Sequence, residues 1–216
     1  MKNYYINILS VFLILFIYIY SYPVKAQLPL QGKVIVIDAG HGGLDPGTVY
    51  KDIYEKNITL SISKYLEKEL SKLGATIIMI RTTDCDLSNN VTNHRKKRDF
   101  DERIKIINQK HVNMYISIHL NYLENPNYYG AQVFYNKNNE NLAKSVQDYL
   151  NKNTNTNRET KKIPSSTYMY KKLTTKGILV ECGFLSNAEE RDKLVTKKYQ
   201  KQFAQHLAKA ISYYYK

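Results

Sequence analysis

Three short apolar runs in this chain each end close to a polar side chain, and this pattern constrains the fold more than any other feature. The runs are residues 33–38, 113–118 and 176–180, and the polar residues after them are His41, His119 and Glu181. Runs rich in β-branched residues are typical of strands buried on both faces, as in a parallel sheet. Parallel strands bring their carboxyl ends to one edge, so we expect these three side chains to lie close together.

Helical patterns alternate with these runs. From Glu55 to Leu73, apolar residues recur at helical spacing, and Gly74 is suited to end a helix. Further strands are predicted at 75–81 and 130–135, and further helices at 99–111, 139–152, 188–195 and 198–214. The alternation predicts an α/β fold: a single domain with a twisted, largely parallel central sheet of about five to six strands, flanked by helices.

Three polar segments are predicted to be loops. Residues 44–52 contain the turn signal Asp45-Pro46-Gly47. Residues 82–98 end in a basic cluster, and residues 153–167 are also polar throughout. Long loops in compact domains are often functional, so the basic loop is of interest.

The first 26 residues differ in character from the rest. An uncharged apolar run, residues 6–20, follows Lys2 and leads to the small-residue pattern Val24-Lys25-Ala26. This predicts a secretory signal ending at Ala26. The alternative is an uncleaved membrane anchor, although the run is shorter than the ~20 residues that a membrane crossing needs. In either case we expect residues 27–216 to form a domain outside the cytoplasm.

The chain is basic, with 32 Lys and Arg against 19 Asp and Glu and a formal net charge of +13. An exported basic protein meets anionic lipid head groups and wall polymers. Nucleic acid is a common partner for such a charge, but export argues against it and the charges are scattered. We therefore expect no nucleic-acid partner, and membrane contact only through the N-terminal segment if it is retained.

The chain has two cysteines, Cys85 and Cys182. A disulfide framework in a secreted protein would use more, and a single bridge requires a specific Cα separation. We therefore do not expect the two cysteines to pair, and neither belongs to a CxxC metal or redox motif.

Two histidines and one glutamate have the chemistry of a metal site. Glu55 opens the helix after the first strand, so its carboxylate starts near the edge that carries His41 and His119. Two imidazoles and a carboxylate form a catalytic zinc set when one position is left to water. The convergence predicts a zinc site at the carboxyl edge of the strands, beside Glu181.

Each of these residues, taken alone, also has a structural explanation. A histidine after a strand is often a satisfied polar group, Glu55 favours a helix dipole, and Glu181 could pair with a lysine or arginine. His94, His111 and His206 lie elsewhere in the predicted elements, and we expect them to be structural.

Four motifs stand in an order that resembles the zinc-dependent N-acetylmuramoyl-L-alanine amidases. They are DAGHGG at residues 38–43, EKN at 55–57, SIHLN at 117–121 and VECGFLSN at 180–187. The resemblance runs from about Val34 to the C-terminus, and it departs at Ala39, where many members have proline. It implies that 27–216 is the catalytic domain, that one Zn²⁺ is held by His41, Glu55 and His119, and that Glu181 is the catalytic acid and base.

Within the family, the chain resembles the germination-specific amidases of spore-forming bacteria. The supporting features are the basic loop ending at Arg98 and the segment GAQVFY at 130–135. The resemblance implies a peptidoglycan substrate in the spore cortex, cut between the lactyl group of N-acetylmuramic acid and L-alanine. The stem-free product would then become muramic-δ-lactam through a separate deacetylase. An extracytoplasmic accessory protein is a further expectation.

Two other functions remain open from the sequence. The first is a zinc amidase or carboxypeptidase that acts on a different wall amide, because one fold supports many chemistries. The second is a non-catalytic wall-binding module, against which the complete ligand set argues. A Cys182 nucleophile is disfavoured, because no histidine is evidently placed to activate it.

Overall fold

A computed structural model describes residues 27–88, 93–137 and 139–215. The elements follow in the order β1 (Val34–Ala39), β2 (Val49–Tyr50), β3 (Ile53–Tyr54), α2 (Glu55–Lys72), β4 (Thr76–Met79), α3 (Arg95–Ile107), β5 (Met114–Asn121), β6 (Gln132–Tyr135), α4 (Glu140–Thr154), β7 (Lys161–Lys162), α5 (Tyr168–Lys172), β8 (Gly177–Phe184), α6 (Ala188–Leu194) and α7 (Lys197–Tyr214). The predicted signal or anchor, residues 1–26, lies outside the described residues. Within those residues, no helix combines the length and apolar character needed to cross a membrane.

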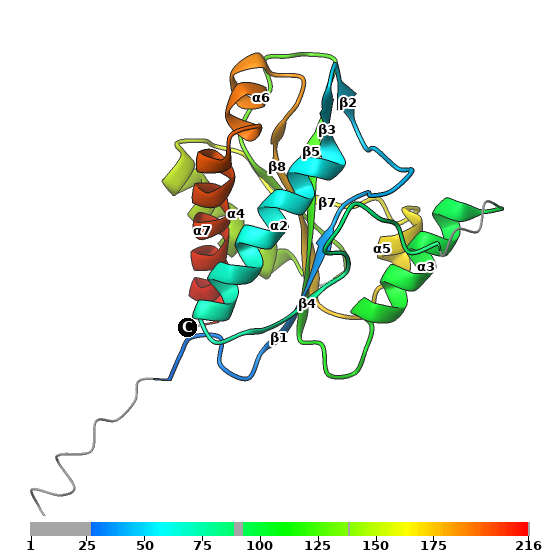
Figure 1. Cartoon of the computed structure of the whole chain (residues 1–216). Helices are drawn as coiled ribbons and strands as arrows, with labels where there is room; N and C mark the ends of the chain where they lie inside the picture. Colours follow the sequence, from blue (N-terminus) through cyan, green and yellow to red (C-terminus); the bar gives the residue numbers. More distant parts are fainter. Residues whose placement is uncertain (1–26, 89–92, 138, 216) are drawn as a thin grey trace, which may run out of the picture.

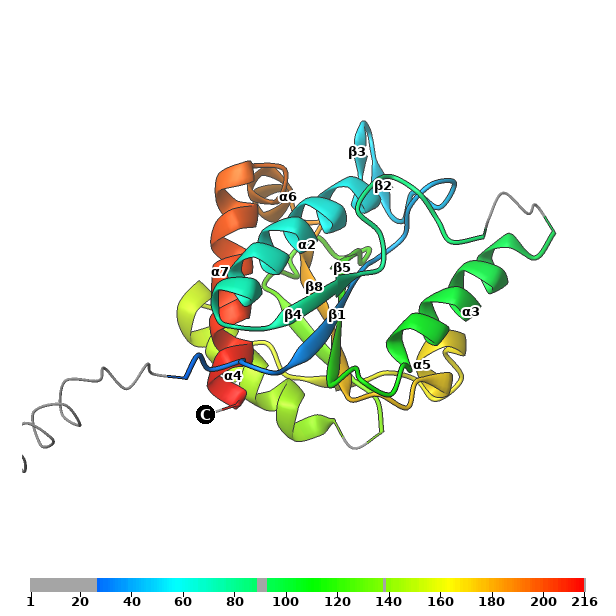
Figure 2. The ribbon, with the colours of Figure 1, turned by 60° about the horizontal axis from the view of Figure 1, so that its bottom comes forward.

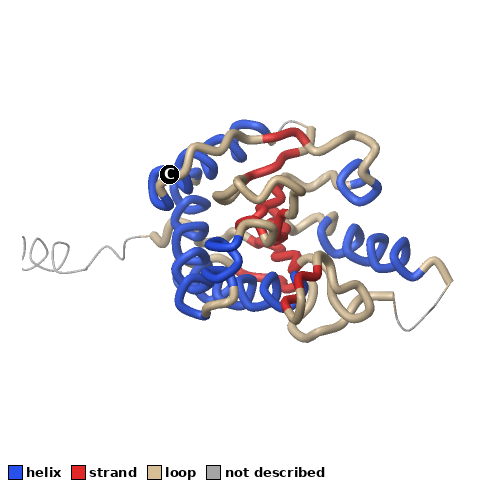
Figure 3. The backbone as a smooth tube through the Cα atoms, turned by 90° about the horizontal axis from the view of Figure 1, so that it is seen from above, coloured by secondary structure: helices blue, strands red, loops and turns tan. Residues whose placement is uncertain are grey.

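The described elements form three layers (Figures 1 and 2). Helices α2, α4 and α7 lie on one side of a central sheet, and α3 and α5 lie on the other. Figure 3, a view from above, shows the strands between these two groups of helices. The predicted α/β architecture is confirmed.

The sheet has six strands in the order β4-β1-β5-β8-β6-β7. Strands β4, β1, β5 and β8 are parallel, whereas β6 pairs antiparallel with β8 and parallel with β7. The three predicted runs are therefore adjacent strands in the middle of the sheet, and their carboxyl ends share one edge. A separate antiparallel pair, β2 and β3, lies in the segment that leads to α2.

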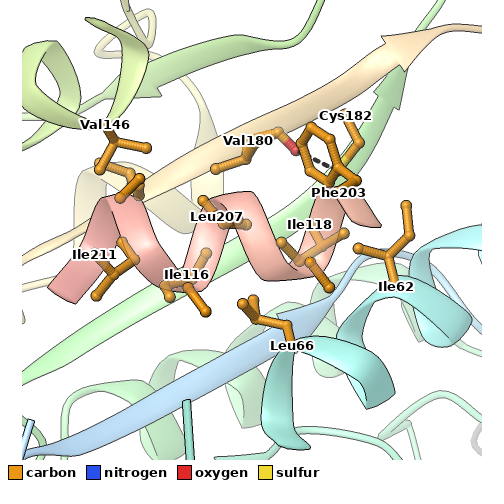
Figure 4. Packing of buried hydrophobic residues seen from close by; sticks show 14 of the residues in the cluster. Ile62, Leu66, Ile116, Ile118, Val146, Val180, Cys182, Phe203, Leu207 and Ile211 are labelled. Atoms are coloured by element: carbon orange, nitrogen blue, oxygen red, sulfur yellow. Dashed lines mark hydrogen bonds between the residues drawn. The ribbon is translucent and has the colours of Figure 1, made fainter. Parts of the chain in front are cut away.

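The larger core lies between the sheet and α2, α4 and α7 (Figure 4). Apolar residues recur every four positions on α2 and α7, which gives each helix one continuous buried stripe. The fully buried members of these stripes include Ile62, Leu66, Leu70, Phe203, Leu207 and Ile211. They pack against the strand residues that point toward the same side, such as Ile116 and Ile118 on β5.

The smaller core lies on the opposite face, under α3 and α5. It includes Tyr115 and Leu179 from the sheet, Ile107 from α3 and Met169 from α5. Buried polar residues also gather here, among them Asp38 and Ser117. The predicted catalytic edge opens on this side of the sheet.

Some predicted boundaries were wrong. Helix α3 begins at Arg95, so the basic residues up to Arg98 form its first turn and do not belong to a loop; it also ends at Ile107, before residue 111. Lysine and arginine have high helix propensity, and Lys97 pairs with Asp101 one turn later. The two-residue strands β2 and β7 lie in segments predicted to be loops, and β3 lies between the predicted loop 44–52 and the predicted helix; all three are too short to show periodicity. The short helix α5 was not predicted either.

Candidate metal centre

The first predicted ligand follows β1 directly. After Ala39 the chain turns through Gly40, and the amide of Gly40 still donates to the carbonyl of Ile118 at 3.0 Å. His41 then adopts a left-handed conformation with φ of 62°. This conformation costs a non-glycine residue about 1–2 kcal/mol, so the surrounding contacts must hold it.

Glu55 is brought to the same edge by the segment that contains β2 and β3. It is the first residue of α2 and is only 3% exposed. Its Oε2 accepts from the amide of Thr48 at 2.8 Å, and its Oε1 accepts from the amide of Leu120 at 2.9 Å. The first bond ties the carboxylate to the segment just before β2, and the second ties it to β5, the strand that carries His119.

The three predicted ligands lie together. His41 Nε2 and His119 Nδ1 are each 3.1 Å from Glu55 Oε1, and the two imidazole rings meet edge to face with centroids 4.9 Å apart. One ligand atom from each residue lies within 4.8 Å of the others. Two imidazole nitrogens and one carboxylate oxygen in this arrangement are a donor set suited to zinc.

The electrostatics of the cluster fit a cation. Burial opposes a positive charge on His41, but hydrogen bonds with Asp45 and Glu55 outweigh it and raise the pKa of His41 to about 9. Burial likewise opposes a charge on Glu55, yet contacts with His119 and His41 lower the pKa of Glu55 below its usual range. The cluster therefore stabilises positive charge between these side chains, where a bound cation would take the place of the protons.

Asp45 belongs to this site, although sequence reasoning assigned it only to a turn. Its Oδ2 lies 3.1 Å from His41 Nδ1. A carboxylate on the far nitrogen of a metal-binding histidine fixes the tautomer and the ring orientation. The sequence signal that could have identified Asp45 is its position four residues after His41.

Two glycines leave the space that the site requires. A Cβ on Gly40 would lie 2.5 Å from Cε1 of His119, and a Cβ on Gly47 would lie 2.7 Å from both Glu55 Oε2 and His41 Cδ2. Real Cβ atoms essentially never come this close to such atoms. Even an alanine at either position would therefore displace a predicted ligand.

Glu181 lies on β8 directly opposite His119 in the sheet register. Its Oε2 is buried and has no hydrogen-bond partner among the described residues. Burial is the main cause that raises the pKa of Glu181 to about 7. A buried carboxylate oxygen without a partner beside a metal-ligand set is suited to hold a water molecule for reaction.

A cavity of about 140 Å³ adjoins the cluster on the α3 and α5 side. Its polar wall includes His41, Asp45 and His119, and its apolar wall includes Phe100, Met169 and Leu179. Lys96 at its border lies 3.4 Å from Asp45. The cavity combines an apolar surface with a few polar groups, which is typical of a site for small parts of a substrate.

The remaining histidines and both cysteines lie outside the cluster. Within the described residues, His41, Glu55 and His119 are the one group found with metal-ligand spacing, so His94, His111 and His206 are not part of it. Cys85 and Cys182 are both free, as expected. Cys182 packs in the larger core on the opposite face from Glu181, and burial raises the pKa of its thiol. A buried, protonated thiol is inert as a nucleophile.

Comparison with known proteins identifies the family. The profile of a family described as N-acetylmuramoyl-L-alanine amidase matches residues 35–213. The germination-specific N-acetylmuramoyl-L-alanine amidase of Bacillus subtilis (strain 168) is 40% identical over 196 residues, which cover 88% of this chain and 82% of the relative.

Solved structures agree. The CwlD amidase from Clostridioides difficile, determined in complex with the GerS lipoprotein, superposes with a TM-score of 0.78 at 36% identity, over 84% of this chain and 98% of that one. An N-acetylmuramoyl-L-alanine amidase from Clostridium difficile 630 superposes with a TM-score of 0.73 at 28% identity, over 84% and 96% of the two chains. The resemblance expected from the four motifs is confirmed, and this chain belongs to the N-acetylmuramoyl-L-alanine amidase family of hydrolases.

Proposed function

We propose that this chain is a zinc-dependent amidase of spore cortex peptidoglycan, with His41, Glu55 and His119 as metal ligands and Glu181 as the proton carrier. One observation carries the proposal: three converging ligand atoms lie beside a buried carboxylate oxygen that has no hydrogen-bond partner among the described residues. The ligands come from three separate segments, so their convergence depends on the complete fold.

The residues fit a single zinc ion. The ligands are Nε2 of His41, a carboxylate oxygen of Glu55 and Nδ1 of His119, and a fourth position is left for water or substrate. The chemistry supplied by a zinc ion bound there is activation of a water molecule and polarisation of the scissile carbonyl. Asp45 keeps the Nδ1 hydrogen of His41 in place, which leaves Nε2 free to bind.

Glu181 moves the proton. Its buried Oε2 accepts a proton from the attacking water, whose hydroxide adds to the carbonyl carbon of the amide. The same oxygen then returns the proton to the amide nitrogen as the carbon–nitrogen bond breaks. Because burial raises the pKa of Glu181 to about 7, the carboxyl group can accept and release a proton near neutral pH.

The bond that we propose is cut joins the lactyl group of N-acetylmuramic acid to L-alanine of the stem peptide. The cortex role rests on the 40% identity with a relative named as germination-specific. In that setting the stem-free muramic acid would pass to a separate deacetylase, and muramic-δ-lactam would form.

Export and a partner complete the proposal. Family members named as cell-wall amidases act on an extracytoplasmic substrate, so we assign residues 1–26 to a secretory signal or anchor and 27–216 to the catalytic domain. The CwlD relative was solved with a lipoprotein, which supports an accessory protein for this chain as well. Co-purification from sporulating cells tests this part, and full activity of the lone chain on cortex material would argue against a required partner.

Metal analysis paired with muropeptide mass analysis tests the central proposal. The wild-type chain should contain about one zinc per molecule and release peptides from glycan strands. Glu181→Gln should retain zinc and lose activity, and His119→Ala should lose both. Full activity of Glu181→Gln would refute the assigned role. Lactyl–alanine bonds that stay intact after exhaustive digestion would instead indicate an enzyme for a different wall amide, and metal-free protein that still binds peptidoglycan would indicate a wall-binding module.

A further inference from the structure

Two buried arginines hold the turn that carries His41. Arg81 donates through Nε to the carbonyl of Ala39 at 2.9 Å and through Nη2 to that of Gly40 at 2.9 Å. Arg103 donates through Nη1 to the carbonyl of Ala39 at 3.1 Å and through Nη2 to that of His41 at 2.7 Å. Three successive carbonyl oxygens of the turn thus accept from two guanidinium groups.

Arg81 also joins this turn to the helix that begins with Glu55. Its Nη2 donates to the carbonyl of Lys56 at 2.8 Å and to Thr59 Oγ1 at 3.2 Å. Thr59 in turn donates to the carbonyl of Gly40 at 2.9 Å. One guanidinium therefore sets the distance between the segments that carry the first two ligands.

Arg103 joins the same turn to the strand that carries His119. Its Nη1 donates to Asp38 Oδ1 at 2.5 Å, and the other oxygen of Asp38 accepts from Ser117 Oγ at 2.5 Å. Ser117 lies on β5 two residues before His119. A second contact, from Nε to Asp99 Oδ2 at 2.9 Å, fixes the guanidinium within α3.

The benefit of these arginines to a metal site must be geometric. Two positive charges beside a cation oppose its binding by electrostatics. Asp38 and Asp99 compensate the charge of Arg103, whereas the hydrogen bonds of Arg81 recorded among the described residues go only to neutral oxygens. Both arginines are only 2% exposed, so burying these charges is costly and the planar fork of donors must supply the compensation.

The turn needs such support because His41 has a positive φ. Its carbonyl and the two before it are oriented by the guanidinium groups, and this orientation directs the His41 side chain toward Glu55 and His119. Gly42 permits the close approach, since a Cβ there would lie 2.9 Å from Cδ of Arg81 and 2.2 Å from the carbonyl oxygen of Cys85.

We propose that Arg81 and Arg103 are positioning residues that pre-organise the three metal ligands by holding the carbonyls of residues 39–41. This inference rests on the proposed metal centre. It assigns the arginines no contact with substrate or metal. Their effect passes through the orientation of His41 and through the spacing of the segments that carry Glu55 and His119.

The test measures zinc affinity of the full chain by competition with a chromogenic chelator, without substrate. Arg103→Met and Arg81→Met should each lower the affinity by about 10–100-fold, the usual effect of losing a group that orients metal ligands. Arg103→Lys and Arg81→Lys keep the charge but replace the planar fork by a single ammonium nitrogen, which cannot reproduce the contacts that each arginine makes from separate nitrogens, so they should also bind zinc more weakly than wild type. Arg98→Met is the matched control, because Arg98 is exposed on the same helix as Arg103 and should retain wild-type affinity.

Thermal unfolding with and without zinc separates positioning from general stability. A purely structural role would lower both melting temperatures equally and leave the zinc-induced increase unchanged, whereas a positioning role reduces that increase. Wild-type affinity and a wild-type increase in the folded lysine variants would overturn the inference, even if the methionine variants fail to fold. If the wild-type chain binds no zinc, the metal-centre proposal fails and this inference fails with it.

Discussion

The two faces of the central sheet are formed by the same strands but have different roles: one packs into the larger core, and the other carries the predicted site. On β5, Ile116 and Ile118 point into the larger core, whereas Ser117 and His119 point to the opposite face. On β8, Cys182 belongs to the larger core and its neighbour Glu181 faces the predicted metal ligands on the other side. Successive residues of a strand alternate between faces, so one short stretch of sequence supplies both core residues and candidate site residues.

The difference between the faces lies in what holds them together. The face covered by α2, α4 and α7 is held by apolar packing, which tolerates substitutions of similar volume. The opposite face combines the smaller apolar core with hydrogen bonds of fixed direction among Asp38, Arg103, Ser117 and Tyr170. Substitutions on the face under α2, α4 and α7 should alter the free energy of unfolding but not the catalytic rate. Substitutions on the opposite face should alter the catalytic rate, either alone or together with the free energy of unfolding.

The largest expected effect comes from a substitution at Glu181, on the face that carries the predicted site. Glu181→Gln keeps the shape of the side chain but cannot accept a proton, so kcat should fall by about 100- to 10,000-fold. Zinc content and melting temperature should stay near wild type, because Oε2 loses no hydrogen bond to any residue that the structure describes. Release of peptide from purified cortex fragments measures the rate. A loss of less than tenfold would contradict the assigned role.

A substitution in the larger core should lower stability and leave zinc binding unchanged. Phe203 on α7 is 1% exposed and packs in the larger core. Phe203→Ala should lower the free energy of unfolding by about 3–5 kcal/mol, through lost burial and the cavity left behind. Denaturant unfolding measures this, and the zinc affinity of the folded protein should not change. A large loss of zinc affinity at temperatures where the variant is folded would show that the two faces are coupled.

Asp38→Asn should change how stability depends on pH, because Asp38 is a buried charged group on the face under α3 and α5. Burial alone would raise the pKa of Asp38, but the Arg103 charge and the Ser117 hydrogen bond outweigh it and lower the pKa from the ordinary value of 3.8. A depressed pKa stabilises the fold fully above the unfolded pKa and less as the pH falls toward the folded pKa. The variant should lose about 3 kcal/mol at pH 7, because one partner of a buried ion pair is removed.

The difference between wild type and Asp38→Asn should therefore shrink below about pH 4. Urea unfolding at a series of pH values measures it. A difference that stays constant from pH 7 down to pH 3 would mean that Asp38 does not contribute through its charge.

The smallest effect should come from the strand neighbour of Glu181. Cys182→Ser places a hydroxyl in the apolar core, which should cost about 1–3 kcal/mol of unfolding free energy. The kcat of the folded variant should match wild type, since the side chain points away from the metal centre. Loss of activity with retained stability would revive a role for the thiol.

The main elements were predictable from the sequence because their signals are local. Buried β-branched runs predicted β1, β5 and β8, and apolar spacing predicted α2 with both ends correct to one residue. The convergence of His41, His119 and Glu181 followed from the parallel order of their strands. The direction of β6 did not, because an apolar strand has the same pattern in either orientation.

The support of the site was not predictable for a different reason. Arg81 ends an apolar run, and Arg103 occupies one position of a charged helix, so neither differs in sequence from a solvated residue. Their partners are largely backbone carbonyls, and every residue has a carbonyl. The spacing of residues in the sequence therefore does not reveal a buried arginine whose partners are backbone carbonyls.

The position of β8 has a consequence for the order of assembly. It is the last strand in the sequence, yet it lies between β5 and β6 in the sheet. Pairings between distant segments form late because a long loop must close first. The sheet stays divided until residues 177–184 enter it, and Glu181 enters with them. The segments bearing the three predicted ligands precede that step, so a newly made chain would gain the proposed proton carrier only when the sheet is complete, and we expect no hydrolysis before that point.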